Sequence, residues 1–340
     1  MSLFFRILLE IIFQIIDIDE QVHSFVSESP SNENSDNSLS ESSKLTSRVP
    51  PSIDNPSTKE NIFVQASDTK PCPTCGAGGS MNSVARSYIY ALGRIQPRFP
   101  TPSIEKEFNQ ALGQANTAGQ TDPQAMQTSL AKRESRYLVR QICWVLTIEG
   151  IETYILQPRD PADFDLLIDA LRPSPRPTDR DLVIGLRGPI APPEACNGLM
   201  VPIVMVDQIY SFDVDGLIKS IPRPEGMAEN KFRSTAEDLF YRIMQMADNA
   251  GATDEHRALN YEAVRDPRIY AYTTEMHGRN FSLSAIEVRP SRLSGTRKIV
   301  DTIFSYRNRN TDVEEKYFVR VDVTEEFPFL VTRLSPFYER

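Results

Sequence analysis

The sequence predicts an α+β protein. A helical and hairpin-containing N-terminal part with a zinc knuckle precedes helices packed on a C-terminal antiparallel sheet. Three observations lead to this fold class. A Cys-x-x-Cys turn, Cys72–Cys75, follows a long polar stretch. Apolar residues then recur at helical spacing before the pattern changes to strand-like runs near Ile142. Short segments typical of strands dominate after about residue 269.

Length and composition restrict the classes of function. The chain has 340 residues, which suggests about two domains plus appendages. Its formal net charge of −9 argues against a nucleic-acid surface, because phosphate binding needs a concentrated excess of Lys and Arg. Four cysteines in a chain of this length, with no cleavable signal sequence evident, indicate a reducing compartment. We therefore expect a cytoplasmic protein.

The first 70 residues divide into two segments. Residues 1–23 contain a strongly apolar run, Met1–Ile18, in which Arg6, Glu10 and Gln14 are spaced so that they share one face of a helix. This run is too short to cross a bilayer. We interpret it as a partner-binding or membrane-surface helix, with a decayed upstream remnant as the alternative. Residues 24–70 are rich in Ser, Asn, Asp, Glu and Pro, which predicts a disordered linker.

Residues 71–225 are predicted to form the first folded part, in which helices precede strands. Pro123 and Pro161, each after an aspartate, are helix-start signals, and Glu149–Gly150 suits a tight hairpin turn. Asp213 is expected to cap a short helix. The expected elements, in order, are helices over 82–95, 104–115 and 122–139, hairpin strands over 142–148 and 151–156, a helix from 160, strands over 182–186 and 199–212, and a helix to 221.

Residues 226–340 are predicted to form the second part, after the proline-rich hinge 222–226. Ser234–Glu237 is interpreted as a capping box that begins a helix closed by Gly251, and Thr253 as the cap of the next helix. An antiparallel meander follows, and the polar side chains of its fourth strand, Arg320 and Asp322, are expected to face water. The expected strands are 269–275, 281–288, 298–306, 316–323 and 329–334.

The cysteines are the strongest candidates for a metal site. A Cys-x-x-Cys turn supplies half of a tetrahedral zinc-thiolate site, and Cys143 and Cys196 would complete it if the fold brings them to Cys72 and Cys75. Such a site would be structural, because four thiolates leave no open coordination position. A thioredoxin-type redox pair, two disulfides and inert thiols are the alternatives.

No catalytic constellation stands out in the sequence. The three histidines are His23, His256 and His277, and none neighbours a cysteine or forms an evident acid–base group. A serine-protease triad is not recognisable, since it needs Asp, His and Ser in positioned loops. We expect no catalytic residue, while a hidden active site stays an open alternative.

Several long strings resemble a known family. The run Cys72–Gly76 and the strings SYIYALGRIQPRFP, QICWVLTIEGIETYILQPRDPADFDLLI, VIGLRGPIAPPEACNGLMVPIVMVDQIYSFD and RALNYEAVRDPRIY are similar to the C-terminal domain of unknown function of PatA/PatG-type cyanobactin maturation proteases. The resemblance covers about residues 71–340. It implies a two-part α+β module and a metal site at the four cysteines. Because no triad is recognisable, we expect a stand-alone copy without the family's subtilisin-like protease domain.

The resemblance leads to three hypotheses of function. The first is a noncatalytic, zinc-stabilised accessory module that binds a precursor peptide or a peptide-tailoring enzyme. The second is a peptide-tailoring enzyme whose active site is not identifiable from sequence. The third is a scaffold, such as a homo-oligomer, assembled through the helix expected at Met1–Ile18.

Overall fold

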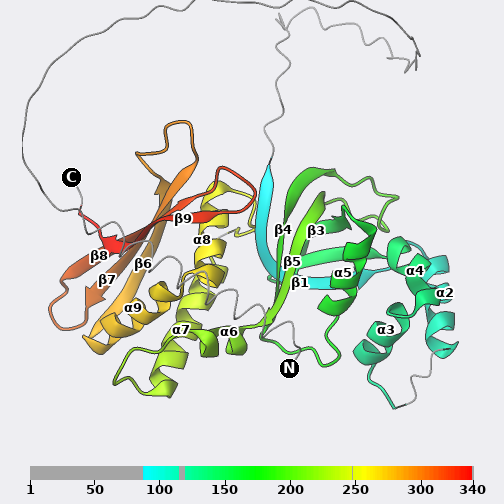
Figure 1. Cartoon of the computed structure of the whole chain (residues 1–340), viewed down its shortest axis with the longest axis horizontal. Coiled ribbons are helices and arrows are strands. Elements are labelled where there is room, and N and C mark those ends of the chain that lie inside the picture. Colours follow the sequence, from blue (N-terminus) through cyan, green and yellow to red (C-terminus); the bar gives the residue numbers. More distant parts are fainter. Residues whose placement is uncertain (1–86, 115–118, 247, 339–340) are drawn as a thin grey trace, which may run out of the picture. The chain divides into compact units, whose positions relative to one another are not determined.

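A computed structural model describes residues 87–114, 119–246 and 248–338 (Figure 1). All of them belong to one compact unit, Gly78–Arg340. The apolar helix, the linker, the knuckle cysteines Cys72 and Cys75, and His23 lie outside the described residues. Helices and sheets both occur in the described part, which confirms the α+β class.

Five strands close into a barrel in the order β1-β2-β3-β5-β4. Neighbouring strands are antiparallel except β3 and β5, which are parallel. A short helix, α5 (Phe164–Ala170), lies between β3 and β4 in the chain. This topology is that of a five-stranded Greek-key barrel of the OB type. The strands are β1 (Tyr88–Arg98), β2 (Cys143–Ile148), β3 (Ile151–Pro158), β4 (Asp179–Ile190) and β5 (Pro202–Asp213).

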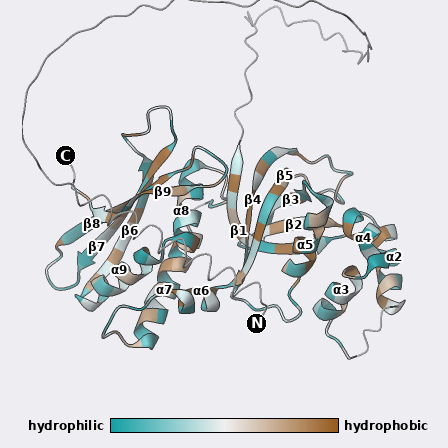
Figure 2. Ribbon diagram, viewed as in Figure 1, coloured by the Kyte–Doolittle hydropathy of each residue, from teal (hydrophilic) through white to brown (hydrophobic). Residues whose placement is uncertain are grey.

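The barrel encloses an apolar core. Ile89, Ala91 and Ile95 of β1 belong to this core together with Trp144, whose indole donates a hydrogen bond to the Val139 carbonyl at 2.9 Å. The apolar colouring of the barrel strands can be followed in Figure 2. Because the interior is filled by side chains, a ligand has to bind on the outside of the barrel.

The helix predicted over 82–95 is wrong, since its described part is strand β1. Tyr90 and Leu92 on its outer face pack with the C-terminal helices, while Ile89 and Ala91 face the barrel core. A strand that is buried on both faces has a nearly continuous run of apolar residues. The periodicity of such a run does not distinguish it from a buried helix.

Helices between β1 and β2 pack at one side of the barrel. The helix predicted over 104–115 is confirmed, whereas the one predicted over 122–139 is broken after Leu130. Leu130 and Leu138, on either side of the break, both pack in the barrel core. The observed helices are α2 (Pro102–Gln114), α3 (Asp122–Leu130), the 3₁₀ turn η1 (Arg133–Ser135) and α4 (Arg136–Gln141).

The hairpin signal is also confirmed. Glu149 and Gly150 both have positive φ, 47° and 83°, as a tight two-residue turn between β2 and β3 requires. Asp160 caps the turn η2 (Pro161–Asp163), which leads into α5, by accepting a hydrogen bond from the Ala162 amide at 2.8 Å.

The C-terminal part is a group of helices on an antiparallel meander, as predicted. The sheet order is β6-β7-β8-β9. Helix α8 contacts β1 of the barrel as well as β6 and β7 of this sheet, so barrel and sheet share one hydrophobic core. The elements are α6 (Val214–Ser220), α7 (Glu229–Met244), α8 (Asp254–Arg265), α9 (Pro267–Gly278), β6 (Phe281–Pro290), β7 (Ile299–Asn308), β8 (Glu314–Asp322) and β9 (Phe329–Pro336).

Two helix boundaries differ from the prediction. Helix α7 begins five residues before the expected capping box, so Ser234 lies within the helix. The same helix ends at Met244, and Gly251 lies instead against β1, where its carbonyl accepts a hydrogen bond from the Tyr90 amide at 2.9 Å. The Thr253 cap of α8 is confirmed, since its hydroxyl accepts a hydrogen bond from the His256 amide.

The strand predicted over 269–275 is wrong, because these residues form α9. Asp266 caps this helix by accepting from the Arg268 amide at 3.1 Å, and Pro267 occupies the first helical position. The β-branched and aromatic residues of the run favoured a strand, but their propensity is weak beside this start signal.

The outer face of the meander is less exposed than predicted. Asp322 of β8 is only 1% exposed, with Arg297 in an ion pair, and Arg320 forms a bidentate pair with Asp301 of β7. An arginine side chain thus covers the Asp322 carboxylate, which the alternation of β8 placed in water.

Candidate functional site

A hollow of about 240 Å³ lies on the outside of the barrel, beside the β2–β3 turn. Strands β1, β2 and β4 supply most of its wall, and the β2–β3 turn and the end of α7 supply the rest. Polar and charged side chains dominate the lining. The lining residues are Leu92, Gly93, Arg94, Gln96, Thr147, Glu149, Gly150, Arg180 and Met244.

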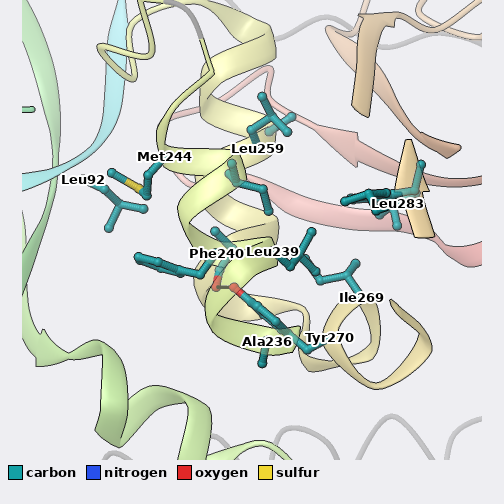
Figure 3. Close-up of a cluster of buried hydrophobic side chains, with 14 of the residues drawn as sticks. Leu92, Ala236, Leu239, Phe240, Met244, Leu259, Ile269, Tyr270 and Leu283 are labelled. Atoms are coloured by element: carbon teal, nitrogen blue, oxygen red, sulfur yellow. Dashed lines mark hydrogen bonds between the residues drawn. The ribbon is translucent and has the colours of Figure 1, made fainter. Parts of the chain in front are cut away.

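The pairing of β1 with β4 places two arginines at this hollow. Leu92 and Leu182 are register partners, and both pack in the core that the C-terminal helices share with the barrel. Figure 3 shows Leu92 close to Met244 of α7. Arg94 lies two residues after Leu92, and Arg180 two residues before Leu182 in the antiparallel strand. Because side chains two apart share a face, both arginines emerge where the helical cover ends.

Main-chain carbonyls hold both guanidinium groups. Arg94 Nε donates to the Asp179 carbonyl at 3.3 Å, and its Nη2 donates to the carbonyls of Arg176, at 3.0 Å, and Pro177. Arg180 Nη1 donates to the carbonyls of Pro177 and Asp179 at 2.7 and 2.8 Å. Within residues 87–338 as described, neither arginine forms an ion pair. The carbonyls orient the two cations without neutralising them.

The β2–β3 turn completes the wall. Glu149 lies in this turn, where its backbone has a left-handed conformation. The Thr147 hydroxyl donates to Gln96 Oε1 at 3.4 Å, which leaves the Gln96 amide as a donor at the hollow. Two arginines and one glutamate give the lining a net charge of +1.

Cys143 and Cys196 come together on the same outer face, at the other end of β2. They are paired as a disulfide with a Cα–Cα separation of 6.0 Å. The pair packs with Val145, Ile155 and Leu199, so the loop over 191–201 covers this end of the β2–β3 face. Because Cys72 and Cys75 lie outside the described residues, the four-cysteine site stays a prediction. No group of metal-ligating residues occurs among the residues that the structure describes.

The other two histidines lie in the C-terminal helices. His256 lies in the first turn of α8 and His277 in the last turn of α9. Burial, together with the charges of Arg309 and Lys231, lowers the pKa of His277 below its ordinary value. Neither residue lines the hollow.

A cluster of charged groups joins the barrel to the β8–β9 loop. Arg159 and Asp207 of the barrel form an ion pair at 3.0 Å. Burial and the neighbouring Asp207 carboxylate raise the pKa of Glu326, in the β8–β9 loop, to about 7, against the influence of Arg159 and Arg257. Arg257 itself is 2% exposed and donates to the Val323 carbonyl at 2.6 Å. The cluster is a structural joint between the two parts, since each guanidinium is matched by a carboxylate or carbonyl.

Sequence reasoning missed the arginine-lined hollow. The sequence pattern predicts a helix at Arg94 and a strand, 182–186, that begins after Arg180. Only the pairing of β1 with β4, between segments 86 residues apart, brings the two together.

Comparisons with known proteins agree with this architecture. Residues 226–337 match the family described as PatG C-terminal. A solved structure described as "PatG Domain of Unknown Function" is similar with a TM-score of 0.61 and 20% sequence identity, covering 74% of this chain and 98% of that one. At this identity the likeness shows the fold alone. No curated protein matches the chain. In the described part of the chain, none of the helices has the length and hydrophobicity that a membrane crossing requires.

Proposed function

Because residues 226–337 form a PatG C-terminal-like domain, we propose that this protein is a noncatalytic recognition module of a cyanobactin-type peptide-tailoring system, where it binds a precursor peptide. The likeness in fold supports a role in such a system, and the residues of the hollow support the binding role. Two alternatives exist: the partner is a peptide-tailoring enzyme, or this chain itself catalyses a reaction. The test below distinguishes both from peptide binding.

The observation that carries the proposal is the polar hollow on the outside of the barrel. Main-chain carbonyls already hold the guanidinium groups of Arg94 and Arg180, so ordering these two side chains on binding costs little conformational entropy. Arginine, glutamine and glutamate offer donors and acceptors that match the amide and carboxylate groups of a peptide.

The test is to titrate the full chain into a dye-labelled precursor peptide of such a system, following anisotropy, and then to measure the mass of the peptide by mass spectrometry. We expect saturable binding and an unchanged mass. A changed mass would establish the enzyme alternative. Absence of binding, with co-purification of a tailoring enzyme instead, would replace the peptide by that enzyme as partner.

We also propose that zinc stabilises the module through Cys72, Cys75, Cys143 and Cys196. The closeness of Cys143 and Cys196 supports this proposal, because two of the four ligands already share one place. Ser87 pairs with Arg187 near the start of the loop that carries Cys196. The 12 residues from Cys75 to Ser87 reach up to about 40 Å when extended, so the knuckle can reach that loop.

The disulfide and the zinc site exclude each other, since a sulfur bonded to its partner is no thiolate ligand. We therefore expect about one zinc per chain by elemental analysis when the protein is purified under reducing conditions without a metal-affinity tag. Cys196→Ser should lose the metal and several kcal/mol of stability. A reduced wild-type protein with four titratable thiols and no zinc would contradict the proposal.

A further inference from the structure

The geometry of the hollow points to a ligand group, and we propose that Arg94 and Arg180 bind a carboxylate of an extended peptide there. This inference rests on the proposed function and names the chemistry of its site. Three observations support it: two arginines lie side by side, their guanidinium groups keep free donors, and the lining has a net positive charge.

The first observation is that two cations lie side by side without an anion. Leu92 and Leu182 lie opposite each other on β1 and β4. Arg94 and Arg180 are each two residues from this pair in the same direction along the barrel, and on the same face. Like charges opposite each other on antiparallel strands are destabilising. Neither has a carboxylate partner in the described part of the chain, although most arginines around them do, for example Arg98 with Glu152 at 2.6 Å. A bound anion would relieve the repulsion.

The second observation is that both groups are pre-oriented with donors to spare. Carbonyls of the loop 176–179 occupy Nε and Nη2 of Arg94 and Nη1 of Arg180. Arg94 Nη1, Arg180 Nε and Arg180 Nη2 have no hydrogen-bond partner within the described residues. Guanidinium groups fixed in this way bind carboxylates through charge-assisted hydrogen bonds at a low cost in entropy.

The third observation concerns the kind of anion. The lining carries a net charge of +1, which one carboxylate balances. A nucleic-acid strand presents a phosphate at each nucleotide and binds through aromatic stacking as well, and none of the lining residues is aromatic. The Gln96 amide lies beside the two arginines as a neutral donor for a peptide carbonyl that flanks the bound carboxylate.

The experiment uses the full chain and three dye-labelled probes. They are a decapeptide with one central Glu flanked by Ser and Gly and an amidated C terminus, its Gln counterpart, and single-stranded oligo(dT) of the same length. Binding is followed by anisotropy and by the NMR signals of the arginine Nε–H groups. The Glu peptide is expected to bind about 10-fold more tightly than the Gln peptide, because a charge-assisted hydrogen bond contributes about 1.5–3 kcal/mol.

Four variants locate the site. Arg94→Gln and Arg180→Gln should each remove most of the preference for the Glu peptide, and Glu149→Gln should strengthen its binding, because it removes a repelling carboxylate. The control is Arg187→Gln, an exposed arginine on the same strand as Arg180 that does not line the hollow. It should bind as the wild type does. Glu149→Gln keeps the inference testable even if an arginine variant fails to fold.

The outcomes separate this inference from the proposed function. Equal binding of the Glu and Gln peptides, unaffected by Arg94→Gln and Arg180→Gln, would overturn the carboxylate site while leaving peptide recognition in place. Tighter binding of oligo(dT) than of the Glu peptide, lost in the same variants, would replace the peptide by a nucleic acid. If none of these probes and no precursor peptide binds, both proposals fail.

Discussion

Gly251→Ala is expected to destabilise the protein by about 3 kcal/mol or more, because two costs add at this position. Gly251 has a φ of +67°, a left-handed conformation that costs a residue with a Cβ roughly 1–2 kcal/mol. An added Cβ would also lie 2.5 Å from the Tyr90 carbonyl oxygen and 2.6 Å from the Ala91 Cα, both of them backbone atoms of β1. Backbone cannot move aside as a flexible side chain can, so the loop before α8 would have to leave the barrel.

The contact broken in this way is part of a polar link between the barrel and the C-terminal helices. The Tyr90 amide donates to the Gly251 carbonyl at 2.9 Å, and the side chain of buried Asn260 donates to the Tyr90 carbonyl at 2.8 Å. Asn260 is in turn bonded to Asn249 at 2.8 Å. Displacing the loop would leave buried polar groups without hydrogen-bond partners, and each such group costs about 1–3 kcal/mol.

Urea denaturation followed by circular dichroism measures the effect, and Gly226→Ala is a matched control. Gly226 has a φ of +76°, but a Cβ there would meet nothing within 4 Å. Its variant should therefore lose only the conformational term, about 1 kcal/mol. Equal losses in the two variants would show that the approach of Gly251 to β1 does not matter for stability.

Local signals predicted much of this fold because several elements are set by a few neighbouring residues. Glu149–Gly150 marked its hairpin, Thr253 marked its helix cap, and alternating runs marked the four strands of the meander. The prediction for β1 failed because both faces of this strand are buried, so its apolar residues do not alternate with polar ones. For α9 the sequence did hold the signal, Asp266–Pro267, but β-branched and aromatic residues after it favoured a strand.

The candidate site was less predictable than the fold, because it depends on strand register. Cys143 and Cys196 could be proposed to meet because cysteine has few structural roles. Arg94 and Arg180 carried no comparable signal, since arginines are common on surfaces and 86 residues separate the two. Their meeting follows from the closure of the barrel, which joins its first strand to its fourth.

A different long-range contact buries a carboxyl group in the core. Glu262 of α8 is 0% exposed and faces the Thr302 hydroxyl of β7. Neither of its oxygens makes a regular hydrogen bond within the described residues. Burial, with a further contribution from Asp266, raises the pKa of Glu262 well above its ordinary value, while Thr302 acts in the opposite direction. Burial therefore favours the protonated, neutral form of the Glu262 carboxyl group in the folded protein.

We expect this carboxyl to make the protein less stable as the pH rises. The folded state keeps a proton that the unfolded chain releases near pH 4.5, so the contribution of Glu262 to stability is complete below that pH. It decreases by about 1.4 kcal/mol for each pH unit until the folded-state pKa is reached. Glu262→Gln should remove this slope, because the amide has nearly the same shape and no proton to lose. The variant should consequently exceed the wild type in stability at pH 8 and approach it near pH 5.

Urea midpoints measured at several pH values from 5 to 8 test this expectation. Glu275→Gln is the control, since Glu275 is an exposed carboxylate on the neighbouring helix α9 and its replacement should leave the slope unchanged. The comparison isolates Glu262 from Glu326, whose raised pKa acts in the same direction and is present in all three proteins. Parallel pH profiles of wild type and Glu262→Gln would mean that Glu262 is solvated or paired in solution, and the close packing of α8 on β7 around it would then have to be abandoned.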